Sequence, residues 1–323
     1  MEYRRLGNTD LKLSVIGFGC WAMGGGWGQT DDRESIAAVR RALDLGINFF
    51  DTADIYGFGH SEKVLSKALG PRRKDVIIAT KVGLAWDEHG CMFRSGSRHH
   101  ITNAVEASLK RLKTDYIDLY QIHWPDSHTP FEITMKTMDD LVKSGKVRYV
   151  GVSNFTVKQI EECMKIRPID SLQPPYNMLM REAEGDLLPF CKKNGIGVVA
   201  YGPLAYGLLT GKFTKDTKFP KTDWRSGELF PDPGDWQRHI DLFHGRQFMR
   251  NLRIVEKIKK IANKHGKTVG QLAIAWVLSN PAVTSAIVGV KRPSQIEENI
   301  GGTGWQISKE ELLQIDEILN KTP

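Results

Sequence analysis

Four side chains that can handle protons follow short apolar runs in the first half of this sequence. Asp51 and Tyr56 lie in the segment DTADIY, Lys81 ends the segment IIATK, and His123 ends the segment DLYQIH. The carboxyl ends of successive strands meet at one face of a parallel barrel, and the active sites of such barrels are built there. We therefore expect a carboxylate, a phenol, an ammonium and an imidazole to share one site.

These four groups suit the reduction of a carbonyl compound. Hydride transfer to a carbonyl carbon leaves an alkoxide, which needs a proton donor whose pKa is brought toward neutrality. Tyr56 is the candidate acid, and a neighbouring Lys81 can stabilise its phenolate and so lower the pKa of the phenol. Asp51 can hold Lys81 and balance its charge. His123 can hydrogen-bond the carbonyl oxygen or share the proton.

Each of these residues also has a structural interpretation. Asp51 can cap the loop after its strand, Tyr56 can be a core aromatic with a solvated hydroxyl, and Lys81 can be a cation at a strand end. His123 taken alone is more often a buried histidine with satisfied hydrogen bonds than a catalyst. Their arrival together at consecutive strand ends favours the catalytic interpretation.

The spacing of the tyrosine and the lysine excludes a short-chain dehydrogenase. That class places the two residues as Y-x-x-x-K on one helix, and no such pattern surrounds Tyr56, Tyr201 or Tyr206. Tyr56 and Lys81 are 25 residues apart. Only a fold that brings strand ends together can unite them.

The pattern of apolar runs predicts such a fold. Runs of this kind, separated by helical periodicities, are typical of parallel strands buried on both faces. The runs expected as strands are 14–20, 47–52, 76–82, 116–122, 147–152, 171–172, 196–200 and 284–288. The helical patterns include 33–45, 61–69, 102–112, 131–143 and 157–165. We expect residues 1–323 to form one α/β domain, a (β/α)₈ TIM barrel, with a doubly wound open sheet as the alternative.

Two segments stand outside this alternation. Residues 211–245 are rich in Pro, Asp, Trp and Lys. A loop of this length in a compact domain is usually a lid or a binding loop, so we expect it to lie over the active site. Trp224 and Trp236 can either line a pocket there or anchor the loop. Residues 304–323 predict a C-terminal helix that packs over the barrel.

Composition and charge narrow the class of protein. A hydrophobic fraction of 41% with 26% charged residues is ordinary for a globular protein with a large core. The net charge of +7 is carried by dispersed basic pairs, which favours a solvated surface over a nucleic-acid site. The amino terminus has no apolar signal region and no run is long enough to span a membrane. We expect a cytoplasmic protein with neither nucleic acid nor membrane as a partner.

The cysteines indicate neither a disulfide framework nor a metal site. Cys20, Cys91, Cys163 and Cys191 form no C-x-x-C pair and have no His-rich tract beside them. Reduced thiols in a cytoplasm are the direct interpretation. No bound metal is expected.

A glycine motif near the amino terminus resembles a dinucleotide fingerprint but lacks its context. Residues 17–22, GFGCWA, match G-x-G-x-x-A after an apolar run. A Rossmann phosphate loop must open a helix, whereas the glycine-rich stretch MGGGWG follows here and makes a helix improbable. We therefore expect no Rossmann fold.

Six motifs, in order along the chain, resemble those of the aldo-keto reductases. They are DTADIYGFGHSE, IIATK, DYIDLYQIHWPD, VGVSNF, YGPLAYGLLTGK and IVGVKRPSQIEEN, and together they cover nearly the whole chain. The segments HWPD, GLLTGK and TGWQIS resemble a branch of bacterial general reductases related to inositol-operon and general-stress proteins. The resemblance implies an NADPH-dependent (NADPH/NADP+) oxidoreductase with Asp51, Tyr56, Lys81 and His123 as its catalytic tetrad.

The resemblance also implies which residues hold the cofactor. Ser153, Asn154 and Gln173 would hold the nicotinamide carboxamide and Tyr201 would stack on the ring, although Ser153 and Asn154 alone equally predict a helix N-cap. The backbone of the glycine-rich turn after Tyr201 would hold the pyrophosphate. The full set is Gly19, Cys20, Trp21, Asp51, Ser153, Asn154, Gln173, Tyr201, Gly202, Pro203, Leu204, Gly207, Lys212, Gly289, Lys291, Arg292, Gln295, Glu298 and Asn299.

Charge and two departures from the family pattern refine this assignment. Lys291 and Arg292 can supply positive charge to a 2′-phosphate, which favours NADP over NAD, although an exposed basic pair before Pro293 is the structural alternative. Cys20 stands where related chains often have threonine, and Gly202 where many have serine. Both positions can act through the backbone, so cofactor binding is expected to survive. Cys20 beside the nicotinamide would be open to oxidation.

The substrate is specified only by class. Trp21, Trp86 and Trp124 flank site elements and predict an aromatic pocket wall. Small aldehydes, dicarbonyls, sugars and cyclic polyol ketones are the expected substrates, for a monomer or a loose homo-oligomer. A potassium-channel β-subunit-like regulatory protein that binds NADPH with little turnover is the alternative. The barrel pattern starts close to Met1 without a long inactivation segment, so an enzyme is favoured.

Overall fold

The eight apolar runs form the strands of one closed parallel barrel in the computed structural model, which describes residues 1–229 and 234–322. The barrel strands are β3 (Ile16–Gly19), β4 (Phe49–Asp51), β5 (Ile77–Val82), β8 (Ile117–Ile122), β9 (Val147–Ser153), β10 (Ser171–Gln173), β11 (Gly197–Tyr201) and β12 (Val283–Gly289). Strand β12 pairs with β3, with Ala286 opposite Ile16, and this pairing closes the sheet. The (β/α)₈ prediction is confirmed, and the open sheet is excluded.

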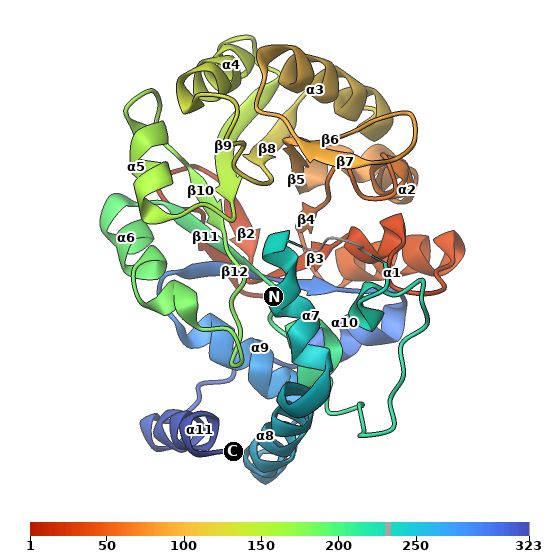
Figure 1. The fold of residues 1–323 in the computed structure, drawn as a ribbon, viewed down its shortest axis with the longest axis vertical. Coiled ribbons are helices and arrows are strands. Elements are labelled where there is room, and N and C mark those ends of the chain that lie inside the picture. Colours follow the sequence, from red (N-terminus) through yellow and green to blue (C-terminus); the bar gives the residue numbers. More distant parts are fainter. Residues whose placement is uncertain (230–233, 323) are drawn as a thin grey trace.

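Helices surround the strands, as Figure 1 shows. They are α1 (Asp32–Asp44), α2 (His60–Leu69), α3 (Arg98–Leu112), α4 (Phe131–Lys143), α5 (Val157–Met164), α6 (Leu187–Asn194), α8 (Gly245–Lys264), α9 (Val269–Ser279), α10 (Pro293–Ile300) and α11 (Lys309–Lys321). Helix α1 begins where the Asp31 side chain accepts a hydrogen bond from the Arg33 amide, and it buries Ala38, Val39 and Ala42. The predicted helices therefore match the observed ones within a few residues.

No α-helix begins directly after the glycine motif GFGCWA of the first barrel strand. Gly17 and Gly19 lie within β3, and a short 3₁₀ turn, Trp21–Gly24, follows. An added side-chain carbon at Gly17 would lie 2.6 Å from the Phe49 ring, so the glycine is needed for packing inside the barrel. The exclusion of a Rossmann phosphate loop is confirmed.

A β-hairpin closes the amino-terminal end of the barrel. Strands β1 (Tyr3–Arg5) and β2 (Lys12–Ser14) pair antiparallel around a turn that starts at Gly7. Its Leu6, Leu11 and Leu13 form one buried cluster with inward residues of the barrel strands. Those inward residues are Phe49, Ala79, Leu119, Val199 and Ile287. Side chains two residues further along a strand face the same way, so the floor is apolar while Asp51 and Lys81 line the layer above it.

A second hairpin was not anticipated. Strands β6 (Leu84–Trp86) and β7 (Met92–Arg94) pair antiparallel in the loop after β5. The Asp87 Oδ1 accepts from the amides of His89 and Cys91 and so fixes the turn. The segment DEHG between the two strands carries that turn signal, because an Asp side chain that bonds the backbone two residues on is a common turn device.

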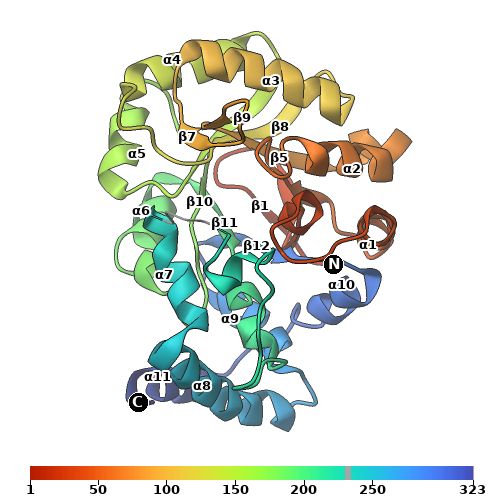
Figure 2. The ribbon, with the colours of Figure 1, turned by 45° about the vertical axis from the view of Figure 1, so that its right-hand side comes forward.

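The C-terminal helix packs on α8 rather than directly over the barrel. Figures 1 and 2 both place α11 beside α8 at the lower end of the molecule. Arg250 donates to the carbonyl oxygens of Thr322 (2.9 Å) and Leu319 (2.6 Å), and Lys257 donates to Thr322 Oγ1 (3.0 Å). Cations at the negative end of a helix dipole are stabilising. The expected helix in 304–323 is thus confirmed, but the basic face of α8 decides where it docks.

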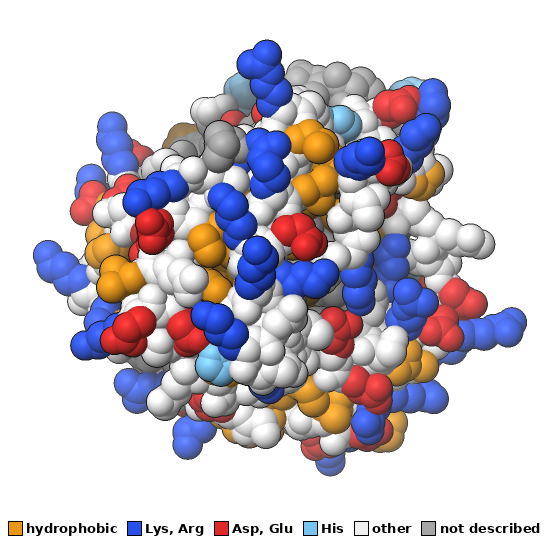
Figure 3. All heavy atoms as spheres, turned by 90° about the horizontal axis from the view of Figure 1, so that it is seen from below, with side chains coloured by type: hydrophobic (Ala, Val, Ile, Leu, Met, Phe, Trp, Pro, Cys, Tyr) orange, Lys and Arg blue, Asp and Glu red, His pale blue; other side chains and the backbone are white. Residues whose placement is uncertain are grey.

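Basic side chains are spread over one face of the molecule. Figure 3, a view from the lower end, shows Lys and Arg groups interspersed with Asp and Glu groups. All four cysteines are free. Within the described residues, no helix is long and apolar enough to cross a membrane.

The barrel floor generates a stability prediction. Leu13 is 0% exposed, so Leu13→Ala should leave a cavity and lower the free energy of unfolding by about 2–5 kcal/mol. The matched control is Leu313→Ala, because Leu313 is 68% exposed and its loss should change stability by less than about 0.5 kcal/mol. Urea denaturation measures both. Equal effects of the two variants would contradict the packing of the hairpin into the barrel.

Candidate active site

A buried ion pair lies at the carboxyl end of the barrel strands. The ammonium of Lys81, which is 0% exposed, donates to Asp51 Oδ1 at 2.6 Å and to the carbonyl oxygen of Thr52 at 2.9 Å. It also donates to the Tyr56 hydroxyl at 3.2 Å. A buried ammonium needs both a counter-charge and further hydrogen-bond partners, and this arrangement supplies them.

Two glutamines fix the other oxygen of Asp51. The Nε2 groups of Gln121 and Gln173 donate to Asp51 Oδ2 at 3.3 and 2.8 Å. The sequence reading did not anticipate Gln121. It precedes His123 by two positions, and the two-residue period of a strand was the signal that could have revealed it. Gln173 was expected at the cofactor, and here it supports the carboxylate.

The loop after β4 presents Tyr56. Ser61 at the start of α2 donates through Oγ to the carbonyl oxygen of Cys20 at 2.9 Å and lies 3.0 Å from Thr52 Oγ1, which ties the loop to the neighbouring strand ends. The rings of Tyr56 and His123 are 5.8 Å apart at an angle of 79°. The structure therefore brings together all four of the residues that the sequence singled out.

Burial sets the protonation states in this site. Burial raises the pKa of Tyr56 to about 12, because the lowering effect of Lys81 is opposed by Asp51. Burial acts to lower the pKa of Lys81, but Asp51 outweighs it and the net pKa is raised. Burial and then Lys81 lower the pKa of His123 well below its ordinary value. In this form the site holds a neutral phenol, a charged lysine and a neutral imidazole.

The expectation that Lys81 brings the Tyr56 pKa toward neutrality is therefore wrong for this form. Lys81 is already paired with Asp51, so the nearby charge is largely balanced and the loss of water around the phenol dominates. The sequence places the lysine near the tyrosine, but it does not reveal how much water the fold removes.

The residues expected at the nicotinamide form one hydrogen-bonded chain. Ser153 Oγ donates to the Gln173 carbonyl oxygen at 2.8 Å, and Tyr201 OH donates to Asn154 Oδ1 at 2.9 Å. Asn154 Nδ2 donates to the His123 carbonyl oxygen at 3.0 Å, which connects the chain to the tetrad.

The capping alternative for Ser153 and Asn154 is wrong. The N-cap of α5 is Thr156, which forms a capping box with Gln159. Asn154 instead adopts a left-handed backbone with φ of 62°, a conformation that asparagine tolerates better than most residues.

A tight turn follows Tyr201, where a pyrophosphate site was expected. Gly202, Ala205, Tyr206 and Gly207 all have positive φ angles. At Gly202 the φ angle is 66° and a side-chain carbon would lie 3.2 Å from the Tyr206 ring, so both the backbone and the packing favour glycine. The Gly207 amide donates to the Leu204 carbonyl oxygen at 3.0 Å, so it is engaged within the turn and not free for a ligand in this form. Pro203 lies in the same turn.

The expected adenosine segment gathers at the start of α10. Gln295 Oε1 accepts from the Lys291 amide at 2.7 Å and from the Arg292 amide at 3.3 Å. Lys212 Nζ lies 3.1 Å from Glu298 Oε2, which joins the end of the turn after β11 to α10. Of the remaining residues, Gly19 ends β3, Gly289 ends β12, and Asn299 is buried in α10.

An aromatic cluster, which we define as Trp21, Trp27, Tyr206, Trp224 and Trp236, packs against Tyr56. Trp21 stacks between Tyr56 (6.0 Å) and Trp224 (5.8 Å), and it meets Trp236 edge-on at 5.5 Å. Trp224 is fully buried, so it anchors the segment 211–245 against the barrel. In Figure 1 the short helix α7 (Gln237–Ile240) of that segment lies in front of the barrel.

The cluster fits an oxygen-rich ligand. The indole N–H groups of Trp27, Trp224 and Trp236 are buried, and none finds an acceptor within the described residues. Buried donors without acceptors are rare in native proteins. A nicotinamide dinucleotide carries many ribose and phosphate oxygens, so the residues present fit such a cofactor.

The tryptophans expected at the substrate lie on different loops. Trp86 packs against Phe58 at 5.3 Å, beside the loop that carries Tyr56. Trp124 follows His123, and the Arg94 guanidinium lies 5.0 Å above its ring. Arg94 in turn pairs with Asp235 at 2.6 Å, so the β6–β7 hairpin and the segment 211–245 meet at this point.

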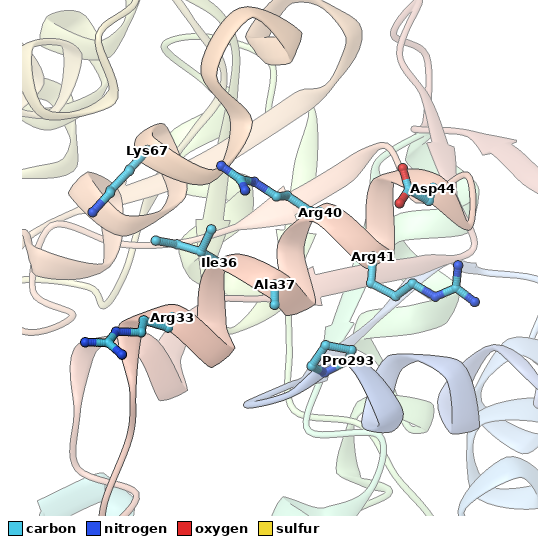
Figure 4. A pocket seen from close by; sticks show the side chains of 8 residues that line it. All are labelled: Arg33, Ile36, Ala37, Arg40, Arg41, Asp44, Lys67 and Pro293. Carbon is cyan, nitrogen blue, oxygen red and sulfur yellow. The ribbon is translucent and has the colours of Figure 1, made fainter.

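Two features lie outside this chemistry. A surface hollow of about 640 Å³, lined by α1 residues, Lys67 and Pro293, lies on the outer wall and contains none of the tetrad (Figure 4). Cys20 is fully buried, and burial followed by Asp51 raises the pKa of its thiol well above the ordinary value. Oxidation proceeds through the thiolate, so this finding argues against the expected reactivity of Cys20. The described residues contain no cluster suited to a metal ion.

Comparison with known proteins matches residues 15–320 to the aldo/keto reductase family. Aldo-keto reductase YhdN of Bacillus subtilis (strain 168) is 41% identical, over 100% of this chain and 95% of that protein. A probable voltage-gated potassium channel subunit beta of Arabidopsis thaliana is 37% identical, over 93% of this chain and 90% of that protein. The structure of glycerol dehydrogenase AKR11B4 from Gluconobacter oxydans has a TM-score of 0.88 at 39% identity and covers 99% of this chain and 95% of its own.

The buried imidazole in this site generates a pH prediction. Because the pKa of His123 is lowered below 6.5, the unfolded chain takes up a proton below pH 6.5 that the folded protein does not. Stability should therefore fall as the pH drops below 6.5, with a contribution from this group that approaches about 1.4 kcal/mol per pH unit. The His123→Gln variant should lose that part of the slope in urea denaturation.

The control for this experiment is His89→Gln. His89 has a side chain that is 77% exposed, so its replacement should leave the wild-type slope unchanged. A His123→Gln variant with the full wild-type slope would show that His123 titrates alike in both states.

Proposed function

Because the chain belongs to the aldo/keto reductase family, an NAD(P)-dependent class of oxidoreductases, we propose that it reduces aldehyde and ketone carbonyls with NADPH and with Tyr56 as the proton donor. The observation that carries the proposal is the contact of Lys81 Nζ with both the Tyr56 hydroxyl (3.2 Å) and Asp51 (2.6 Å). A bound NADPH would supply the hydride. The residues of the chain supply the proton and hold the carbonyl group.

Tyr56 keeps its proton until charge develops on the substrate oxygen. With its pKa raised to about 12, the phenol is protonated across the physiological range. As the carbonyl oxygen becomes an alkoxide, the proton moves to it and the Lys81 ammonium stabilises the phenolate that remains. Lys81 keeps its distance from the Tyr56 hydroxyl during this step because it is bonded to Asp51. Asp51 is held in turn by Gln121 and Gln173.

His123 acts as a neutral hydrogen-bond donor to the substrate oxygen. Its lowered pKa keeps the ring uncharged at neutral pH, and a neutral imidazole still carries one N–H. A donor aimed at the place where negative charge develops stabilises the transition state more than the ground state. His123 therefore orients the carbonyl while Tyr56 delivers the proton.

The cofactor assignment follows the placement of the matching motifs. Ser153, Asn154, Gln173 and Tyr201 would hold the nicotinamide, and the turn after Tyr201 with Lys212 would hold the pyrophosphate. Lys291 and Arg292 would bind the 2′-phosphate, with Gln295, Glu298 and Asn299 around the adenosine. The ion pair between Lys212 and Glu298 supports this proposal, because it joins the end of the turn after β11 to α10. The segment 211–245 would cover the cofactor and the active site.

The proposed substrates are small carbonyl compounds: aldehydes, dicarbonyls, sugars and cyclic polyol ketones. Trp21, Trp86 and Trp124 would form an aromatic wall of their binding pocket. We place the chain in the branch of bacterial general reductases, in line with its 41% identity to YhdN. A probable channel β-subunit is also similar to this chain, at 37% identity, so a regulatory protein that binds NADPH with little turnover is the alternative.

Removing the Tyr56 hydroxyl tests the proposed acid. Tyr56→Phe should reduce the rate of carbonyl reduction by about 10²- to 10⁴-fold, because the alkoxide then has no positioned proton donor. NADPH binding, followed by quenching of its fluorescence, should be almost unchanged. The matched control is Tyr3→Phe, which removes a hydroxyl that bonds the Gly46 carbonyl oxygen at the floor of the barrel. Turnover retained in Tyr56→Phe would remove Tyr56 as the acid.

Cofactor titration tests the basic pair. The wild type should bind NADPH more tightly than NADH, and Arg292→Ala should weaken NADPH binding by roughly tenfold or more, because a charge-assisted bond to the 2′-phosphate is lost. NADH lacks that phosphate, so its affinity should stay the same in the variant. Equal affinities of the wild type for NADPH and NADH would contradict the assignment of Lys291 and Arg292 to the 2′-phosphate.

A further inference from the structure

A histidine of the segment 211–245 is buried in an unusual setting. His239 lies in α7 and is 0% exposed. Its ring stacks on Trp236 at 3.9 Å and 15°, and it faces Tyr201 at 6.4 Å and Tyr206 at 5.5 Å. The imidazole thus lies between the aromatic cluster and the residue proposed to hold the nicotinamide.

Neither ring nitrogen of His239 has a hydrogen-bond partner in the described residues. The backbone of Trp236 has a small hydrogen-bonding effect that raises the pKa of the ring, but its geometry is too poor to satisfy either nitrogen within the described residues. Burial, followed by Arg238, lowers the pKa of His239 to about 3, so the ring is neutral at ordinary pH. A neutral imidazole still has one N–H donor and one lone pair, and both are here withdrawn from water.

Packing alone does not account for a histidine at this position. Phenylalanine would fill the same space and stack on Trp236 without burying two polar nitrogens, and buried polar groups without partners destabilise a fold. Among the described residues, the indole N–H groups of Trp236 and of the neighbouring Trp224 have no acceptor either. Several buried nitrogens in this part of the segment therefore lack a partner among the described residues, and a bound molecule with acceptor oxygens would supply one.

The chemistry of that partner is specified by these groups. It must bring oxygens that accept from N–H donors, and it must lie beside Tyr201. The ribose and pyrophosphate of a nicotinamide dinucleotide have these oxygens, whereas an apolar ligand would leave every donor unsatisfied. We propose that His239 is a cofactor-binding residue that hydrogen-bonds a ribose or phosphate oxygen in the nicotinamide half of the dinucleotide, an inference that rests on the proposed function.

The His239→Phe variant tests the inference by two measurements, the melting temperature of the protein and the Kd for NADPH. It keeps the ring that stacks on Trp236 and removes both nitrogens, so the cofactor-free protein should melt at the same temperature as the wild type or higher. The Kd for NADPH, measured by fluorescence quenching, should rise by roughly tenfold. The Kd for adenosine 2′,5′-bisphosphate, measured by calorimetry, should not change, because that probe lacks the nicotinamide half.

A control variant and a second probe separate the outcomes. His89→Phe makes the same chemical change at an exposed position and should leave all three measurements at wild-type values. An unchanged NADPH Kd in His239→Phe overturns the inference. A lower melting temperature with equal weakening of both ligands also overturns it, because His239 would then be a packing residue. A wild type that binds no NADPH would instead refute the proposed function itself.

Discussion

The ion pair between Lys81 and Asp51 is the interaction on which the rest of the site depends. An ammonium with no exposed surface is stable only with a counter-charge and further acceptors, which Asp51 and the Thr52 carbonyl oxygen provide. Asp51 is fixed in turn by amide donors from Gln121 and Gln173. One charge pair therefore links β4, β5, β8 and β10, so the position of the Tyr56 hydroxyl is set by four strands of the barrel.

The barrel interior separates this charged layer from the apolar floor. Along β4, Phe49 packs with the hairpin leucines while Asp51, on the same side of the strand, joins the ion pair. The same change occurs along β5 between Ala79 and Lys81. The floor supplies packing that the polar layer cannot supply, since buried polar groups contribute little net stability beyond satisfying one another. The residues that stabilise the barrel by packing therefore lie at its amino-terminal end, and the charged residues lie in the layer above them.

The segment 211–245 differs from the barrel in how its buried polar atoms are satisfied. Trp224 packs as a core residue, yet its indole N–H and both nitrogens of His239 find no partner in the described residues. Local rules of polar satisfaction are most often broken at functional sites. The rings of the aromatic cluster hold this segment against Tyr56, while several of its buried polar atoms lack partners within the described residues.

The sequence by itself determined the eight strands, most helices and the four polar residues that meet at the strand ends, because side-chain direction along a strand or helix repeats with a fixed local period. The same period places Gln121 on the same side of β8 as His123. Tertiary structure alone decided that Thr156 rather than Ser153 or Asn154 caps α5, that α11 docks on α8, and that the Tyr56 pKa is raised rather than lowered. These outcomes depend on contacts between distant segments and on the water that those contacts exclude, which no local pattern encodes.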